Sequence, residues 1–264
     1  MHKDTRFFTK SRLAYYRAAS PMNWDAHWAA EFNPALYPDH SVGLGALSFI
    51  SDVLHEKLRE REGKILEAGC GMGHIVHELR MQGFDCEGVD SAVLTIAKIH
   101  EMKPDLPVRV GDLLRLDVPD AFYAGYISLG VVEHLEEGPE PFLTEAHRVL
   151  AQNGIAIFAV PFLNTIRRIK AWLGIFSSPP TSGEYFYQYA FTQHEFTEIL
   201  QKNGFHVLQV TYYDPWKGLK DELAFCAWLN SKPDLAYKCR VWANKKTWLY
   251  PHAVHMLALV CGKQ

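Results

Sequence analysis

An acid followed by three alternating glycines is the part of this sequence best suited to hold a small-molecule cofactor. The run Glu67-Ala68-Gly69-Cys70-Gly71-Met72-Gly73 follows a short apolar segment and precedes a helical pattern. Glycine at alternate positions lets a turn reach φ > 0 and lets a ligand lie against bare backbone. Dinucleotide sites need Gly-x-Gly-x-x-Gly, and here His74 takes the place of the third glycine. An acid beside the turn would repel a phosphate and attract an ammonium group, so the spacing indicates a nucleoside-like cofactor without a pyrophosphate.

Two further acids follow short apolar segments downstream. Asp90 comes about 20 residues after the first glycine, the interval at which a Rossmann-like fold hydrogen-bonds a ribose. Asp112 ends the next such segment. A carboxylate at a strand end can also cap a turn, and this alternative stays open for Asp90.

Two histidines are candidate general bases. His134 follows the predicted strand at 124–129, and His194 follows an aromatic segment. A neutral imidazole can take the proton of a hydroxyl near pH 7. We expect His134, with His194 in reserve, to act as a base if the substrate atom is a hydroxyl; a structural role for His134 stays open.

The elements that would position these residues alternate between apolar strands and amphipathic helices. We predict helices at 45–61, 74–82, 92–101, 140–150 and 195–202, and strands at 64–68, 86–89, 106–110, 124–129, 155–160, 205–212 and 254–261. Short apolar strands that alternate with helices indicate a parallel sheet covered on both faces.

These motifs resemble those of the class I S-adenosylmethionine-dependent methyltransferases of the small-molecule type. The glycine turn is similar to their hydrophobic-(Asp/Glu)-x-Gly-x-Gly-x-Gly motif, and Glu133-His134-Leu135 is similar to the turn after their fourth strand. The resemblance covers roughly 64–160 and, more loosely, the rest of the chain. It implies an α/β Rossmann-like fold whose seven-stranded sheet is mostly parallel, with helices on both faces. It further implies an N-terminal helical cap, a lid insertion after the fifth strand, and a last strand inserted antiparallel beside the sixth.

The resemblance also implies a cofactor and its binding residues. The cofactor is S-adenosyl-L-methionine, and the product is S-adenosyl-L-homocysteine. The implied residues are Glu67, Gly69, Cys70 and Gly71 for the methionine end, Asp90 and Ser91 for the ribose, Asp112 and Leu113 for the adenine, and Leu129 near the sulfonium.

Length and composition narrow the possible classes. At 264 residues we expect one domain, divided into a cap and first helix (1–60), a cofactor-binding core (61–160), a lid (161–191) and a C-terminal part (192–264). A net charge of −3 gives no electrostatic case for nucleic acid. The five scattered cysteines argue against a metal site. Because we find neither a signal segment nor an apolar run long enough to span a membrane, we expect a cytoplasmic protein. We further expect a monomer or a homodimer.

The N-terminal arm is rich in aromatic residues. Helical spacing over 13–17 predicts a short helix that Ser20-Pro21 ends. The arm is either packed on the core or a cap over the cofactor. As a cap, it would bring the rings of Tyr15, Trp24 and Trp28 near the sulfonium.

The lid begins with a basic amphipathic segment at 165–176. Its apolar face carries Ile166, Ile169, Trp172, Leu173 and Phe176, and its basic face carries Arg167, Arg168 and Lys170. The apolar face either packs on the core or makes a peripheral membrane contact, and the basic face is a hypothetical site for an anionic surface or substrate. Tyr185, Tyr187 and Tyr189 would share one side of an extended strand, as a substrate wall or as packing alone.

Three functions compete. The first is a methyltransferase acting on an O or N nucleophile of a small-molecule or lipid- or sugar-linked acceptor. The second is a non-catalytic S-adenosylmethionine-binding partner or regulatory protein, and the third is an NAD-dependent Rossmann enzyme. The acids at 67, 90 and 112 favour the first two over the third, and nothing in the sequence separates the first two.

Overall fold

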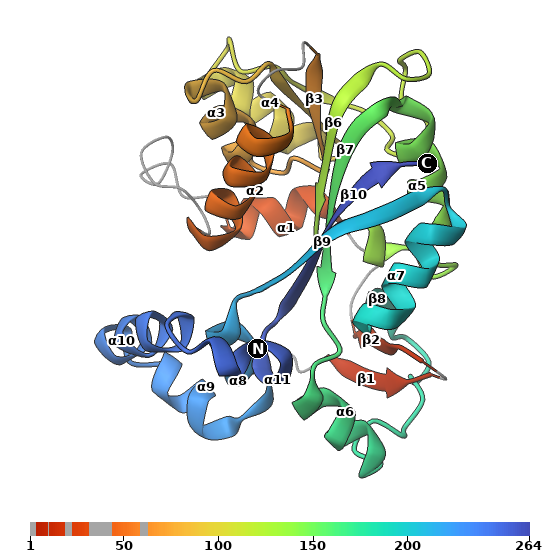
Figure 1. Ribbon diagram of the computed structural model, residues 1–264. Coiled ribbons are helices and arrows are strands. Elements are labelled where there is room, and N and C mark those ends of the chain that lie inside the picture. The colour runs from red at the N-terminus through yellow and green to blue at the C-terminus, as the bar shows by residue number, and fades with distance from the viewer. Residues whose placement is uncertain (1–3, 10, 19–22, 32–43, 59–62) are drawn as a thin grey trace.

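A computed structural model of the chain describes residues 4–9, 11–18, 23–31, 44–58 and 63–264. Its largest feature is a seven-stranded sheet of order β5-β4-β3-β6-β7-β10-β9 (Figure 1). The strands are, in chain order, β3 (Lys64–Ala68), β4 (Cys86–Asp90), β5 (Val108–Val110), β6 (Tyr123–Leu129), β7 (Leu150–Pro161), β9 (Phe205–Tyr213) and β10 (Met256–Lys263).

The strand directions confirm the predicted fold. β3 pairs in parallel with β4 and β6, and the pairs β4–β5 and β6–β7 are parallel as well. β10 lies between β7 and β9 and is antiparallel to both. Parallel neighbours need long crossover connections, and the intervening helices supply them. The sheet is thus seven-stranded and mostly parallel, with its last strand inserted antiparallel beside the sixth, as the resemblance implied.

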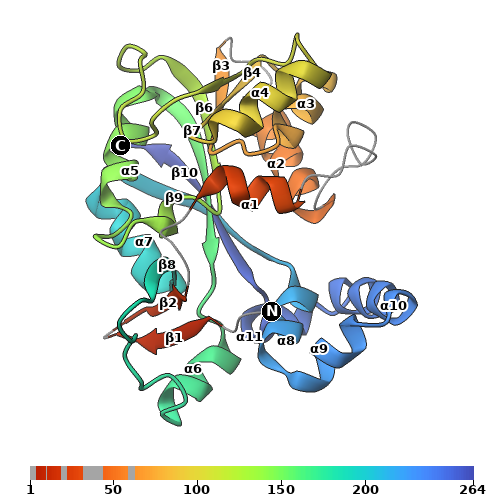
Figure 2. The same ribbon diagram turned by 180° about the vertical axis from the view of Figure 1, so that it is seen from behind.

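Helices cover both faces of this sheet (Figures 1 and 2). The covering helices are α2 (Leu44–Lys57), α3 (His74–Met81) and α4 (Val93–Met102) on one face, and α5 (Glu140–Val149) and α7 (Gln193–Lys202) on the other. Neighbouring side chains of a strand point to opposite faces of the sheet: Ile127 packs on the face covered by α2, α3 and α4, and Tyr126 packs on the face covered by α5 and α7. The predicted helix at 45–61 ends at Lys57, and 59–62 lie outside the described residues.

A second, three-stranded antiparallel sheet was not predicted. It consists of β1 (Thr5–Phe8), β2 (Leu13–Arg17) and β8 (Tyr185–Ala190), in the order β1-β2-β8. The helix predicted over 13–17 is therefore wrong, while the extended form assumed for the tyrosine segment is right. Aromatic residues favour strands when they pack across a sheet, as Tyr16 and Phe186 do with their ring centroids 5.8 Å apart. The stop at Ser20-Pro21 lies outside the described residues.

Three further parts complete the site region. They are α1 (Trp24–Glu31), α6 (Thr165–Trp172) after β7, and a helical unit between β9 and β10 that contains α8 (Pro215–Glu222), α9 (Ala224–Asn230), α10 (Pro233–Asn244), the 3₁₀ helix η3 (Thr247–Leu249) and α11 (Tyr250–Ala253). The helical unit has its own apolar core around Trp216 and Leu249. Within the described ranges, no helix has the length and apolar character needed to span a bilayer.

Candidate active site

One cavity of about 1070 Å³ extends from the glycine turn, at the carboxyl ends of β3, β4 and β6, to the small sheet and α8. Open α/β sheets bind their ligands at this edge. Pockets for a single drug-sized molecule measure roughly 300–1000 Å³. The cavity therefore has room for a cofactor and a second molecule.

The glycine turn at one end of the cavity is held in place by Asp90. Gly69, Gly71 and Gly73 have φ values of 80°, 48° and 68°, which residues with a side chain rarely adopt. The backbone N–H of Gly71 donates to Asp90 Oδ2 at 2.7 Å, and the N–H of Ala92 donates to Oδ1 at 2.9 Å. Asp90 therefore caps this turn, as the alternative interpretation of the sequence held. Each carboxylate oxygen can accept a second hydrogen bond, so Asp90 can also accept from a ribose.

Glu67 lies at the end of β3 and faces the same cavity. Its side chain is buried and accepts a hydrogen bond from the N–H of Val76, in the first turn of α3, at 3.1 Å. Burial, with a smaller contribution from the charge of Asp90, raises the pKa of Glu67 to about 8. A cation bound beside Glu67 would favour its ionised form.

Helix α1 covers the glycine turn. Asp25 fixes this helix to α4, because its Oδ1 accepts from the N–H of Thr95 at 3.0 Å and from the Thr95 hydroxyl at 3.2 Å. Trp28 then lies on Gly71, where an added Cβ would be 2.4 Å from the indole ring. Gly71 does not line the cavity for this reason, whereas Trp28 and Trp24 do. The Trp28 Nε1–H is buried without a partner among the described residues.

The other predicted cofactor residues border this end of the cavity. Asp112 follows β5, and its Oδ1 accepts from the Leu114 N–H at 2.9 Å, which fixes the loop. The remaining predicted residues that line the cavity are Gly69, Cys70, Ser91, Leu113 and Leu129. Three carboxylates at the ends of β3, β4 and β5 thus border one cavity, and this fits a cofactor with an ammonium group, a ribose and an adenine.

His134 ends the short 3₁₀ helix η2 (Val132–His134) and lines the middle of the cavity. Its Nδ1 lies 2.6 Å from the backbone carbonyl of Tyr187, and its ring packs against Trp24 with a centroid separation of 4.8 Å. A carbonyl only accepts hydrogen bonds, so Nδ1 carries the proton and Nε2 keeps its lone pair. Burial lowers the pKa of His134 to about 4, which keeps the ring neutral at physiological pH.

Glu133 is a site residue that the sequence reasoning did not single out. Its side chain is buried, lines the cavity, and leaves Oε2 without a hydrogen-bond partner among the described residues. Burial raises the pKa of Glu133 to about 8. The sequence feature that could have identified Glu133 is its position beside His134 in the Glu-His-Leu motif.

His194 and two of the three candidate tyrosines lie away from the cavity. His194 is on the surface of α7, 3.5 Å from Glu198, with 85% of its side chain exposed. Tyr187 lines the cavity, but Tyr185 is exposed and Tyr189 donates its hydroxyl to the carbonyl of Glu136 at 2.9 Å. The register shift between β2 and β8 turns Gln188 toward the cavity as well. The prediction that alternate side chains of this strand share the cavity side is therefore wrong, because the adjacent residues Tyr187 and Gln188 both line the cavity.

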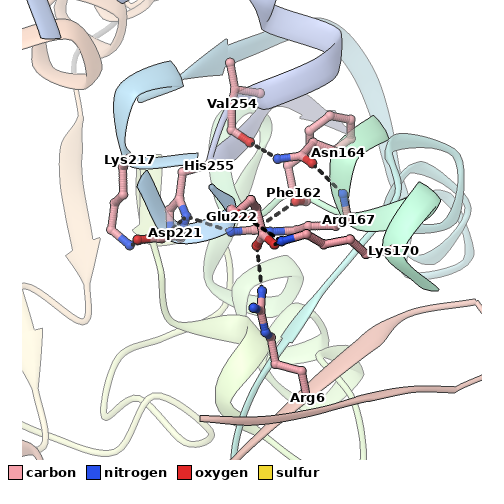
Figure 3. Close-up of polar contacts among 10 residues, drawn as sticks. All are labelled: Arg6, Phe162, Asn164, Arg167, Lys170, Lys217, Asp221, Glu222, Val254 and His255. Atoms are coloured by element: carbon pink, nitrogen blue, oxygen red, sulfur yellow. Dashed lines mark hydrogen bonds and ion pairs between the residues drawn. The ribbon is translucent and has the colours of Figure 1, made fainter. Parts of the chain in front are cut away.

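The far end of the cavity is formed by charged residues from β1, α6 and α8 (Figure 3). The buried carboxylate of Glu222 accepts from Arg167 Nε at 2.9 Å, from Lys170 Nζ at 2.8 Å and from Arg6 Nη1 at 2.6 Å. Arg167 is itself 1% exposed and also donates to the carbonyl of Phe162 at 2.7 Å. Sequence periodicity gave no signal for this group, because Arg6 and Glu222 are 216 positions apart.

The orientation of α6 corrects the prediction for the segment at 165–176. Its basic residues Arg167 and Lys170 face inward to Glu222, while Ile169, Trp172 and Leu173 are exposed. A buried carboxylate without a cation beside it destabilises the fold, and this explains why the basic residues of α6 face Glu222. The prediction that the apolar face packs on the core is therefore wrong for Ile169, Trp172 and Leu173. The prediction that Arg167 belongs to an outward basic face is wrong as well.

The sequence profile of a methyltransferase domain family matches residues 45–210. A protein of Mycolicibacterium smegmatis named as a probable S-adenosylmethionine-dependent methyltransferase is 29% identical over 59% of this chain and 58% of its own. A ubiquinone biosynthesis O-methyltransferase of Pectobacterium atrosepticum is 28% identical over 61% and 63%, respectively. The matches therefore span less than two thirds of these relatives.

Solved structures show the same fold. A 1,6-didemethyltoxoflavin-N1-methyltransferase of Burkholderia thailandensis, with bound 1,6-didemethyltoxoflavin and S-adenosylhomocysteine, superimposes with a TM-score of 0.57 at 17% identity and 98% coverage of both chains. A TehB-like S-adenosylmethionine-dependent methyltransferase of Corynebacterium glutamicum gives 0.54 at 19% identity, covering 91% of this chain and 98% of that one. At these identities the likeness supports the fold.

Proposed function

This chain belongs to the methyltransferase domain family; from that premise we propose that it is an S-adenosylmethionine-dependent methyltransferase and that it methylates an O or N nucleophile of a small-molecule or lipid- or sugar-linked acceptor. The observation that carries this proposal is that the same cavity is lined by the three strand-end carboxylates at one end and by His134 in the middle, with a further compartment beyond His134.

We assign the cofactor residues as follows. Glu67 and the backbone of Gly69 and Cys70 hold the methionine end, Asp90 with Ser91 holds the ribose, Asp112 with Leu113 holds the adenine, and Leu129 lies near the sulfonium. Gly71 contributes indirectly, because its N–H is taken by Asp90 and its Cα face is covered by Trp28. The buried Trp28 Nε1–H is a donor for the cofactor carboxylate. The bound cofactor supplies an electrophilic methyl group on a sulfonium.

The residues in the middle of the cavity position the acceptor and take its proton. The carbonyl of Tyr187 fixes the ring of His134, so that Nε2 has the lone pair that accepts the proton lost by the hydroxyl or amine. Trp24 and Tyr187 pack against the ring and exclude water from it. Burial lowers the pKa of His134 to about 4, which keeps the ring neutral throughout the physiological range and also makes it a weak proton acceptor. Positioning of the acceptor then supplies most of the rate enhancement.

Acceptor screening with a labelled methyl donor tests this proposal. Hydroxyl- and amine-bearing amphiphiles, such as quinols and polyprenyl-linked sugars, would be compared with free sugars and with nucleic acid. Methylation of an O or N atom that falls about a hundredfold in His134→Gln, with unchanged S-adenosylhomocysteine affinity, is the expected result. Methylation only of nucleic acid, or at a carbon atom, would overturn the proposal.

We also propose that α6 contacts a membrane surface. Ile169, Trp172 and Leu173 of this segment are exposed, and α9 presents the stacked rings of Phe225 and Trp228 at the same end of the molecule (Figures 1 and 2). Exposed tryptophan and aliphatic side chains on a short amphipathic helix are typical of interfacial binding.

Cosedimentation with phosphatidylcholine vesicles, with and without phosphatidylglycerol, tests this contact. The double variant Trp172→Ser/Leu173→Ser should lose binding, and Met81→Ser, which removes an exposed apolar side chain from α3, should not. Equal binding by both variants, or no binding by the unmodified protein, would show that this surface does not contact lipid.

A further inference from the structure

The far end of the cavity carries more positive charge than the protein itself neutralises. The described residues that line this end include five cations, Arg6, Arg167, Lys170, Lys217 and Lys220, and two carboxylates, Asp221 and Glu222; Asp214, just outside the lining, adds a third carboxylate near Lys217 and Lys220. His255 lies among them and stays neutral, because burial lowers its pKa to about 4. The cations come from three elements, β1, α6 and α8, so their convergence results from the fold; Figure 3 shows all of them except Lys220.

The hydrogen bonds within this group leave donors unused. Three of the five N–H groups of Arg167 reach protein partners, which are Glu222, a backbone carbonyl and His255. Lys217 Nζ lies 3.2 Å from Asp221 and 3.0 Å from His255. Lys220 is half-buried and forms no ion pair within the described part of the chain. An ammonium group has three donors and a guanidinium has five, so free N–H groups face the cavity.

Tyr15 is a second, independent observation at the same place. Its side chain is 7% exposed and lines the cavity, and its hydroxyl lies beside Arg6 without a hydrogen bond of normal geometry among the described residues. The Arg6 guanidinium lies 5.9 Å from the centre of the Tyr15 ring. A buried hydroxyl without a partner costs free energy, and a ligand oxygen would remove that cost.

The size of the charge excess favours one class of anion. A carboxylate carries a single charge and would leave most of the excess uncompensated. A phosphate monoester carries about −1.5 to −2 at pH 7 and offers three acceptor oxygens to donors that converge from several sides. We propose that this end of the cavity binds the phosphate or diphosphate group of the methyl acceptor, with the nucleophile of the same molecule held at His134.

The walls next to this subsite are apolar. Leu223, Ala224 and Ala227, at the start of α9, line the cavity beside the cations. A phosphate ester with an apolar portion would therefore fit, and its source is either a soluble ester or a lipid. The inference rests on the proposed function, because it places the anion on the acceptor and not on the cofactor.

Calorimetric titration of the S-adenosylhomocysteine-saturated protein with inorganic pyrophosphate tests the subsite. We expect Lys217→Gln/Lys220→Gln to weaken pyrophosphate binding at least about tenfold, because the variant removes two ammonium groups that can donate charge-assisted hydrogen bonds to the anion. Tyr15→Phe, which removes only the hydroxyl, should weaken binding about fivefold. The matched control Lys202→Gln/Lys238→Gln removes two exposed lysines outside the cavity and should leave binding within about twofold.

Two further arms separate the possible outcomes. Phosphatidylcholine vesicles that contain phosphatidic acid identify a lipid source if their binding also depends on Lys217 and Lys220; binding of pyrophosphate alone identifies a soluble ester. If S-adenosylhomocysteine binds the protein but pyrophosphate and the phosphatidic acid vesicles do not, this inference fails and the proposed function stands. Anion binding that is equal in the double variant and the control overturns the subsite. Loss of S-adenosylhomocysteine binding would instead count against the proposed function.

Discussion

Glu222 is the acid on which the far end of the cavity depends, and Glu222→Gln is the most informative single perturbation of the fold. Its carboxylate is fully buried and is the common partner of Arg167, Lys170 and Arg6. Glutamine has nearly the same shape, so the substitution removes charge without leaving a cavity. Its amide keeps one carbonyl oxygen for an arginine but presents a donor to Lys170.

The magnitude follows from the burial of the partners. Removing one member of a buried ion pair costs about 3–5 kcal/mol, because the other charge is left without a partner. Arg167 is only 1% exposed at its side chain, whereas Arg6 and Lys170 are 15% and 22% exposed and regain water. Since the amide still accepts one hydrogen bond, we expect the lower value, about 3 kcal/mol. For a chain of this size, that lowers Tm by about 6–12 °C.

Differential scanning calorimetry and urea unfolding measure this loss directly. The matched control is Glu198→Gln, which removes an acid that is half-exposed and pairs only with His194 in the described structure. The control should change the free energy of unfolding by no more than about 0.5 kcal/mol. If Glu222→Gln is as stable as Glu198→Gln, Glu222 does not hold these cations together as described.

Three other perturbations give distinct results. The pKa of Glu67 is raised from 4.5 to about 8 in the folded state, so the stability it contributes is present below about pH 4.5 and lost as the pH rises toward 8. Urea unfolding of Glu67→Gln should therefore show a shallower decline over that window, by up to about 1.4 kcal/mol per pH unit, and an unchanged slope would refute the assignment. Gly71→Ala places a Cβ 2.4 Å from Trp28 at a φ of 48°, so we expect at least about tenfold weaker S-adenosylhomocysteine binding by calorimetry, whereas Gly83→Ala, where nothing lies within 4 Å, should bind normally. Trp28→Phe keeps an aromatic side chain but replaces the indole and its N–H by a smaller phenyl ring, and a loss of about 1 kcal/mol in cofactor affinity is expected; full affinity would mean that this donor does not contact the cofactor.

The parts of the site that the sequence could predict are those built from neighbouring residues. The glycine turn, Asp90 and Asp112 each follow a strand, and parallel strands bring their carboxyl ends to one edge of the sheet. Apolar periodicity likewise located the strands and helices of the large sheet, because each one buries a regular face. His134 was found for the same reason, as it follows β6 directly.

The parts that could not be predicted depend on contacts between distant segments. The tyrosine segment pairs with β2 about 170 positions earlier, and this pairing turned an expected helix into a strand. The basic face of α6 was expected to meet solvent, because hydropathy alone places charges outside; the buried Glu222 reverses that preference. His194 illustrates the opposite error, since proximity in sequence to the tyrosine segment did not bring it near the cavity.

The most direct test of the account is a crystal structure of the protein with S-adenosylhomocysteine. The account predicts the ribose hydroxyls on Asp90, the adenine beside Asp112 and Leu113, and the sulfur facing His134 across the cavity. A ligand held elsewhere, or a ribose that does not contact Asp90, would contradict the assignment of this cavity as the active site.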